Sequence, residues 1–336
     1  MSERLEGIAT VDIAALFQAG SSGAGIETDR AVLSAMKRCN GFITTGFPRS
    51  DELDARIGRL LTFFDLPEDQ RMALATRRFR PEASHCYRGF FPLPRSRGWA
   101  HNEIFDYGPA MPSQAPDGHP VKVFLEEMNQ WPDPAPKPGW ADEALALLAE
   151  LREIVVAVMA ALARSLALDV DTFMAAFDDD NGTLRILHYP PVPDDFVAAT
   201  GEELPEVVDG MGRRIITRSH VDACALSLLW QDDVGGLQYE GDDGRWREVP
   251  ARPGALSIHC GQALEKMTEG RLKGTPHRVI GTGRDRCSMG MFLEPMFTAV
   301  ISHDSGAPPI TYADHMKHDF AGLDHYANVM GDAVAE

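Results

Sequence analysis

The sequence predicts an α+β protein, because helical patterns gather in the first half of the chain and strand patterns in the second. The longest helical pattern, Ala141–Leu166, precedes a series of short strand-like runs that begins near residue 182. Turn signals separate these runs, as in a sandwich or a barrel. Strands and helices do not alternate along the chain, so a doubly wound parallel sheet is not expected.

The N-terminal third is expected to mix short strands with two helices. Strand patterns cover residues 8–13 and 41–47, and helical patterns cover Thr28–Cys39 and Asp51–Phe64. Residues 71–118 show little periodicity and are rich in Arg, Pro, Gly and aromatic residues. An irregular stretch of this length in a compact chain is usually functional or poorly ordered.

Ala141–Leu166 has apolar residues at three- and four-residue steps, which predicts a helix that supports the core. A short helix is expected over 169–177. The strand-like runs then follow at residues 184–189, 225–230, 236–240, 255–260, 275–280 and 287–293. The acidic stretch 193–213 between the first two runs is interpreted as a surface loop or lid.

Charge and cysteine content exclude several classes of protein. The 336 residues include 50 acidic and 32 basic ones, giving a net charge of −18, which disfavours nucleic acid and anionic membranes as partners. An anionic small substrate is still compatible with a local arginine pocket. Five cysteines without a C-x-x-C pair fit a reducing compartment. With no signal peptide or membrane span in the pattern, we expect a cytoplasmic protein, a monomer or weak dimer.

The candidate chemistry lies in the strand-rich half. His220 and Asp222 form an H-x-D motif, and on an extended strand these two side chains point to the same face. A distant His277 would complete a set of two imidazoles and one carboxylate. Such a set leaves three neighbouring positions open on a metal, as in non-heme Fe(II) oxygenases.

A candidate carboxylate-binding pair follows the last of these histidines. Arg286 and Ser288 are two residues apart on a predicted strand, so both face the same way. The arginine can bind a carboxylate in bidentate fashion, and the Tyr189 hydroxyl can add a further hydrogen bond.

The other histidines of interest are expected to have structural or solvent-exposed positions rather than roles as metal ligands. His101 and Glu103 repeat the H-x-D spacing but lie in the irregular region without a downstream partner. His315 and His318 are expected on a solvated helix face, and His259 is expected in the core or behind the metal site.

Motifs along nearly the whole chain resemble those of the 2-oxoglutarate/Fe(II)-dependent oxygenases of the isopenicillin N synthase-like group. The segments are IATVDIAALF, GFITTGF, LPEDQR, YRGFFPL, NEIFDYG, LRILHYPP and SHVDACALSLLWQDDVGGLQ, followed by W-x-x-V-P, P-G-A-L-x-I-x-x-G, T-P-H-R-V and R-x-S-x-x-x-F. The core motifs, from H-x-D onward, are specific for the family.

The resemblance implies a double-stranded β-helix, or jelly roll, with a helical N-terminal portion packed outside it. The implied segments are 1–118 as the N-terminal region, 119–181 as helical support, 182–298 as the jelly-roll core and 299–336 as a C-terminal helical segment, all in one structural unit.

The resemblance also implies the ligands. His220, Asp222 and His277 would bind Fe(II), and Arg286, Ser288 and Tyr189 would hold 2-oxoglutarate. Oxygen would be the third reactant, with succinate and CO2 released as a small-molecule substrate is oxidised, most simply by hydroxylation. The chain departs from the family pattern at two places. His188 replaces an aromatic or arginine residue and bears on the hydrogen bonding of the co-substrate, and the long 193–213 loop is either a cover over the pocket or a tolerated insertion.

Substrate contacts are expected from the irregular region, the strand after H-x-D and the C-terminal helix. The candidates are Arg88, Phe91, Arg95, Phe105, Trp230 and Tyr312. If Arg88 or Arg95 points inward, a substrate with a carboxylate follows.

Several alternatives stay open from the sequence. On the same scaffold the enzyme could desaturate, cyclise or form ethylene, and NEIFDYG has some likeness to the ethylene-forming enzyme. A relative using iron and O2 without 2-oxoglutarate is a second class. A non-catalytic jelly-roll binding protein and a hydrolytic zinc site are further alternatives.

Overall fold

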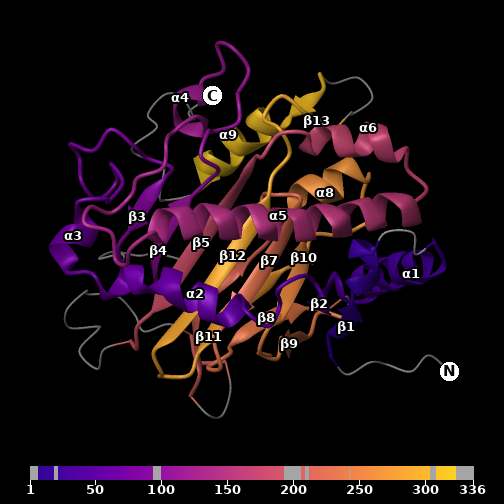
Figure 1. The fold of residues 1–336 in the computed structure, drawn as a ribbon, viewed down its shortest axis with the longest axis horizontal. Helices are drawn as coiled ribbons and strands as arrows, with labels where there is room; N and C mark the ends of the chain where they lie inside the picture. The colour runs from indigo at the N-terminus through magenta and orange to yellow at the C-terminus, as the bar shows by residue number, and fades with distance from the viewer. Residues whose placement is uncertain are drawn as a thin grey trace.

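The computed structural model describes residues 7–18, 22–93, 100–192, 206–208, 212–241, 243–302 and 308–322. Its described part is an α+β fold of two main sheets with helices packed around them (Figure 1). The predicted class is therefore confirmed. None of the described helices is long and apolar enough to cross a membrane.

Eight strands form the larger sheet, in the order β1-β2-β10-β7-β12-β5-β4-β3. Their bounds are β1 Ala9–Asp12, β2 Gly41–Thr45, β3 Gly89–Phe91, β4 Glu103–Tyr107, β5 Gly182–Tyr189, β7 Leu226–Gln231, β10 Leu256–Cys260 and β12 Arg286–Leu293. The N-terminal region thus does more than pack outside the core, since its strands extend the sheet at both edges. Only β1 and β2 pair in parallel; the other neighbours run antiparallel.

The smaller sheet has four strands in the order β6-β11-β8-β9, with the bounds β6 Arg214–His220, β8 Leu237–Glu240, β9 Trp246–Glu248 and β11 His277–Gly281. A separate pair joins β13 (Val300–Ser302) to β14 (Ile310–Thr311). Tyr189, Leu237 and Val279 belong to one apolar cluster, which draws on strands of both main sheets.

Helix α5 (Trp140–Ser165) lies across the larger sheet in Figure 1 and matches the predicted Ala141–Leu166 within one residue. Leu148, Leu151, Val155, Val158 and Leu162 of its predicted stripe are buried. Burial of each such side chain contributes about 1.5–3 kcal/mol. The indole N–H of Trp140 donates to the Leu60 carbonyl (3.2 Å), which fixes the start of α5 against α2.

The remaining helices include some that the patterns located only in part. They are α1 (Ser22–Cys39), α2 (Leu53–Leu61), α3 (Glu68–Met72), α4 (Lys122–Leu125), α6 (Val170–Met174), α8 (Gln262–Met267) and α9 (Tyr312–Gly322), with short 3₁₀ turns at Ala14–Phe17, Thr62–Asp65 and Ala175–Phe177. Helix α1 begins before the predicted Thr28, in a segment whose Gly23 and Gly25 weaken the helical signal.

The region predicted to be irregular, 71–118, contains β3 and β4. Every residue of both strands is buried, so neither shows the apolar–polar alternation that reveals a strand with one exposed face. Of the predicted 193–213 loop, only 206–208 and 212–213 are described, with Val207 bridging to Arg214. The lid interpretation concerns residues outside the described part.

Candidate metal centre and carboxylate pocket

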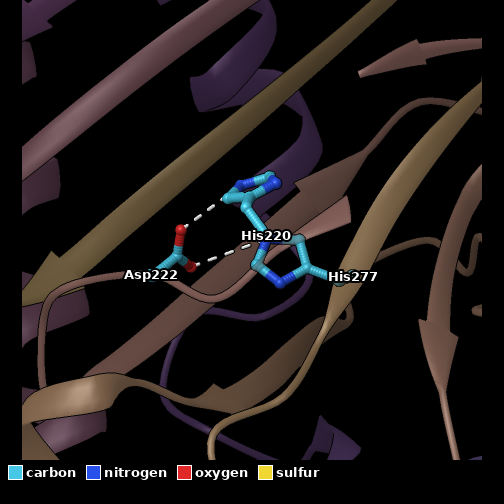
Figure 2. A group of neighbouring side chains, drawn as sticks. All are labelled: His220, Asp222 and His277. Carbon is cyan, nitrogen blue, oxygen red and sulfur yellow. Dashed lines mark ion pairs between the residues drawn. The ribbon is translucent and has the colours of Figure 1, made fainter. Parts of the chain in front are cut away.

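Two histidines and an aspartate converge where the smaller sheet ends. His220 closes β6 and His277 opens β11, and the two residues are direct partners in the antiparallel register. Asp222 follows two residues after His220, just beyond the strand rather than on it. His220 Nε2 lies 3.6 Å from Asp222 Oδ1, and His277 Nε2 lies 3.7 Å from Asp222 Oδ2 (Figure 2).

Backbone carbonyls orient both imidazoles. His220 Nδ1 donates to the Arg218 carbonyl (2.9 Å) and His277 Nδ1 donates to the Thr275 carbonyl (3.0 Å). A carbonyl only accepts, so each Nδ1 carries the hydrogen and each Nε2 keeps its lone pair. Both lone pairs are therefore available as metal ligands, and the outer hydrogen bonds hold the rings in place.

A hydroxyl and the neighbouring charges tune the carboxylate. Ser227 Oγ donates to Asp222 Oδ2. Burial acts to raise the pKa of Asp222, but the charges of His277 and His220 outweigh it and lower that pKa. Burial, followed by the charge of His277, lowers the pKa of His220 to about 4. Both shifts favour a neutral His220 imidazole beside an ionised Asp222 carboxylate.

This donor set fits a divalent metal. The three candidate ligand atoms lie within 4.8 Å of one another. Nitrogen from two imidazoles with one carboxylate oxygen is the set that non-heme Fe(II) sites use with open positions. The side chains of His220, Asp222 and His277 are 29%, 13% and 6% exposed, so the group opens outward through His220.

A narrow inner cavity of about 70 Å³ leads away from these ligands between the two main sheets. Arg286 and Ser288 of β12 line it together with Tyr189, which is the register partner of Arg286 on β5. The predicted clamp residues therefore share a wall, and the cavity also reaches His220, Asp222 and His277.

One guanidinium nitrogen of Arg286 has no hydrogen-bond partner in the described part of the chain. Its Nε donates to the Gly235 carbonyl (2.6 Å) and its Nη2 to Gln231 Oε1 (3.4 Å), while the buried Nη1 has no hydrogen-bond partner among the described residues. The guanidinium also stacks on the Tyr189 ring, 4.6 Å from its centroid. A buried cation with an unused N–H is expected to meet an anion.

A second, outer cavity of about 560 Å³ also reaches the trio. His220 and Asp222 line both cavities, as do Arg185 and Phe292. Residues of helix α9 form part of its wall: Met316, Asp319 and Phe320. A molecule in the outer cavity would lie directly beside the candidate metal ligands.

Two predicted substrate residues belong to a buried network instead. Arg88 is 3% exposed, and its Nη1 donates to Thr183 Oγ1 (2.7 Å). Tyr312 is fully buried, and its hydroxyl donates to Glu294 Oε1 (3.1 Å). Neither Arg88 nor Tyr312 lines a described cavity. Arg88 contacts Thr183, which lines the outer cavity, and its role toward a substrate stays a prediction.

The other predicted substrate residues have mixed positions. Phe91 and Phe105 are buried in the main hydrophobic cluster, with the Phe105 and Phe63 rings 4.3 Å apart, and their assignment stays a prediction. Trp230 contributes to the inner cavity wall, although its indole N–H donates to Asp54 on α2 (2.8 Å). Arg95 lies outside the described residues.

One histidine interpretation was wrong. His315 is buried, not solvated: its Nε2 donates to the Ala223 carbonyl (3.0 Å) and its Nδ1 accepts from Lys266 Nζ (2.9 Å). Burial lowers its pKa to about 4. His318 on the same helix is exposed as expected. His259 is buried with its ring 5.3 Å from that of His277, which confirms the expected position behind the site.

Glu103, which lies two residues after His101, has structural partners rather than a metal. It pairs with Arg71 and accepts from His188 Nδ1 (3.0 Å), whose Nε2 donates to Asp285 (2.8 Å). Burial acts to lower the pKa of His188, but its two carboxylate partners outweigh this and raise it. The His188 departure therefore forms an ion-pair chain beside Tyr189.

Sequence reasoning missed residues that act through tertiary contacts. Gln231 supports Arg286, Ser227 supports Asp222, and Asp319 lines the outer cavity. Ser227 and Gln231 lie inside the core motif SHVDACALSLLWQDDVGGLQ, but the motif alone assigned no role to them. Asp319 had no local signal beyond its place in the predicted C-terminal helix.

Comparison with known proteins agrees with this geometry. A model of the 2OG-Fe(II) oxygenase superfamily matches residues 180–295. A protein of Dictyostelium discoideum named as a probable iron/ascorbate oxidoreductase is 29% identical over 85% of this chain and 80% of its own length. Isopenicillin N synthase of Streptomyces clavuligerus is 24% identical over 77% of this chain and 78% of its own. For several other curated relatives the match spans about half of their length, 47% and 52% in two cases.

The fold has solved counterparts. A full-length protein of Neurospora crassa, solved in complex with alpha-KG (2-oxoglutarate), superposes with a TM-score of 0.71, covering 94% of this chain and 96% of that chain at 18% identity. The protein described here is thus an oxidoreductase that uses Fe(II), 2-oxoglutarate and O2. Together the family model, these relatives and the solved structure support a 2-oxoglutarate/Fe(II) oxygenase of the isopenicillin N synthase-like superfamily.

Proposed function

We propose that the protein is a dioxygenase that hydroxylates a small-molecule substrate and releases succinate and CO2. The observation that carries this proposal is the shared cavity between the metal-ligand trio and Arg286. One end offers two imidazoles and a carboxylate, and the other offers a buried guanidinium N–H without a partner among the described residues.

His220, Asp222 and His277 would hold the iron, and Arg286, Ser288 and Tyr189 would hold the distal carboxylate of 2-oxoglutarate. When bound, iron and 2-oxoglutarate supply the oxidation: O2 and 2-oxoglutarate yield succinate, CO2 and one oxygen atom for the substrate. The residues of the chain supply orientation, since carbonyls fix both imidazoles and Ser227 fixes the carboxylate.

The inner cavity is narrow and mostly apolar apart from its charged ends. Leu187, Leu229, Leu237 and Val279 line its walls. Such walls exclude bulk water, which strengthens the pairing of Arg286 with a carboxylate. The wider outer cavity would receive the substrate beside His220 and Asp222.

The proposal includes the architecture. The two facing main sheets, with both candidate sites between them, would form the double-stranded β-helix, with segments 1–118, 119–181, 182–298 and 299–336 as one structural unit. The net charge of −18 supports a small-molecule substrate rather than nucleic acid or a membrane surface. All five cysteines are free, which supports a cytoplasmic location.

The test is succinate formation from 2-oxoglutarate with Fe(II) and O2, including the slow turnover without added substrate. The wild-type protein should form succinate, and His220→Ala or Asp222→Ala should abolish it. His318→Ala, a histidine exposed on α9, serves as the matched control and should keep full turnover. O2 uptake without succinate would overturn the proposal in favour of an oxidase independent of 2-oxoglutarate, and ethylene in the headspace would identify the ethylene-forming reaction.

A further inference from the structure

We propose that the substrate carries a protonated amine, which pairs with Asp319 in the outer cavity. The inference rests on the proposed function, because that function places the substrate beside His220 and Asp222. The Asp319 carboxylate on α9 has no role in binding iron or 2-oxoglutarate in that proposal.

Helix α9 directs one face toward the cavity and the fold. Tyr312, His315, Met316, Asp319 and Phe320 recur at three- and four-residue steps and therefore share that face. Tyr312, His315, Met316 and Phe320 are buried, whereas Asp314 and His318 on the other face are exposed. Asp319 is thus an acidic residue on the inward face of the helix.

The position of this face relative to the metal ligands is fixed. His315 Nε2 donates to the carbonyl of Ala223, the residue after Asp222, and its Nδ1 accepts from Lys266 on α8. Asp319 lies one turn beyond His315 on the same side of the helix. The carboxylate is therefore part of the cavity wall beside the loop that carries Asp222.

Asp319 forms no hydrogen bond and no ion pair with any residue in the described part of the chain. Its surroundings disfavour a bare charge: burial, followed by the charge of Asp222, raises the pKa of Asp319 to about 6, although the charges of His318 and Arg185 act to lower it. An unpaired carboxylate in such a place costs free energy unless a ligand pairs with it. A cationic group on the substrate would satisfy that requirement.

The other charged groups around the cavity are already engaged. Glu294 accepts from the hydroxyls of Thr183, Tyr312 and Tyr87. The cations are Arg185, held by Asp106 through two hydrogen bonds (2.8 and 2.7 Å), Lys266, bonded to His315, and Arg218, which is exposed at the cavity rim.

The remaining wall suits the body of an amine. Tyr87, Phe292, Met316 and Phe320 line the cavity, and the Tyr87 and Phe320 rings lie 5.5 Å apart. Aromatic faces attract ammonium groups as well as apolar surface. A carboxylate on the substrate would instead meet Asp319, Glu294 and Asp222. The cations in this lining are Arg218 at the rim and Arg185, which is already paired with Asp106.

Three probes of similar size separate these charges: phenethylamine, 2-phenylethanol and 3-phenylpropionate. Their dissociation constants are measured by calorimetry on the full chain loaded with Fe(II) and 2-oxoglutarate without O2. We expect the amine to bind at least about tenfold more tightly than the alcohol, as one charge-assisted hydrogen bond provides. Asp319→Asn should remove most of that preference and leave alcohol binding within about twofold.

Asp314→Asn is the matched control, because it removes the same charge from the exposed face of α9 and should keep the preference. Equal binding of amine and alcohol, tighter binding of the carboxylate, or no binding of the amine overturns the inference. So does an unchanged preference in folded Asp319→Asn. The wild-type comparison needs no substitution, so a misfolded variant would not remove the test. Binding of 2-oxoglutarate, measured first, reports separately on the proposed function.

Discussion

Replacing Arg286 with Gln should weaken 2-oxoglutarate binding far more than any other single change in the inner cavity. The substitution removes a buried cation whose Nη1 has no partner within the described part of the protein. It also removes the donors to Gly235 and Gln231, so those acceptors lose a hydrogen bond as well. The fold should tolerate the change, because glutamine keeps a polar group and part of the packing on Tyr189.

The size of the effect follows from the burial of Arg286, because only 3% of the residue is exposed. Removing one partner of a buried, hydrogen-bonded charge pair costs about 2–5 kcal/mol in binding. A value of about 3 kcal/mol, in the lower half of that range, corresponds to about a 150-fold rise in the dissociation constant of 2-oxoglutarate. Arg286→Lys keeps the charge but loses the planar fork, so its effect should be intermediate, about tenfold.

The assay is a titration of 2-oxoglutarate into the Fe(II)-loaded protein without O2, with iron binding measured separately. Arg284→Gln is the matched control, because Arg284 is two residues away, its side chain is 63% exposed, and its ion pair with Asp233 spans 3.8 Å. It should change the dissociation constant by less than about twofold, since an exposed pair of this kind contributes little. A folded Arg286→Gln protein that binds 2-oxoglutarate as tightly as wild type would refute the role given to Arg286.

Three further predictions concern residues around the two sites. Ser227→Ala should weaken iron binding about 10-fold or more, because Asp222 loses its supporting hydroxyl; an unchanged iron titration would argue against that support. Tyr189→Phe should raise the 2-oxoglutarate dissociation constant less than about fivefold, since the ring that stacks on Arg286 remains; a loss as large as that of Arg286→Gln would contradict this. His188 has a raised pKa in the fold, so its ion pairs stabilise fully below its unfolded pKa of about 6.5 and are lost as pH rises through the folded value. Urea unfolding should show a flatter decline with rising pH for His188→Gln, and identical profiles would refute the linkage.

The sequence predicted those parts that depend on local pattern. The apolar stripe of the Ala141–Leu166 helix and the strand runs after residue 182 correspond to α5 and to β5, β7, β8, β10, β11 and β12. The H-x-D spacing predicted that His220 and Asp222 face the same way, and the family resemblance implied His277 as the third ligand. The three side chains do lie together, although Asp222 lies just beyond its strand.

Other features depend on tertiary contacts that no local pattern reveals. Strands β3 and β4 are buried on both faces, so their sequences lack alternation. Arg88 looked like a residue for binding an anionic substrate, yet its hydrogen bond to Thr183 holds it within a buried network. Helix α9 carries several polar residues, so His315 resembled a solvated residue until its contacts with Ala223 and Lys266 were known.

The central claim is that one cavity holds Fe(II) on His220, Asp222 and His277 with 2-oxoglutarate between that metal and Arg286. Anaerobic titration with both ligands tests it most directly, through the weak visible absorption band of Fe(II) chelated by 2-oxoglutarate. We expect the band to saturate at one Fe(II) and one 2-oxoglutarate per chain in the wild type, and to be missing in Asp222→Ala. A wild-type protein that binds one Fe(II) and one 2-oxoglutarate without developing the band would contradict it.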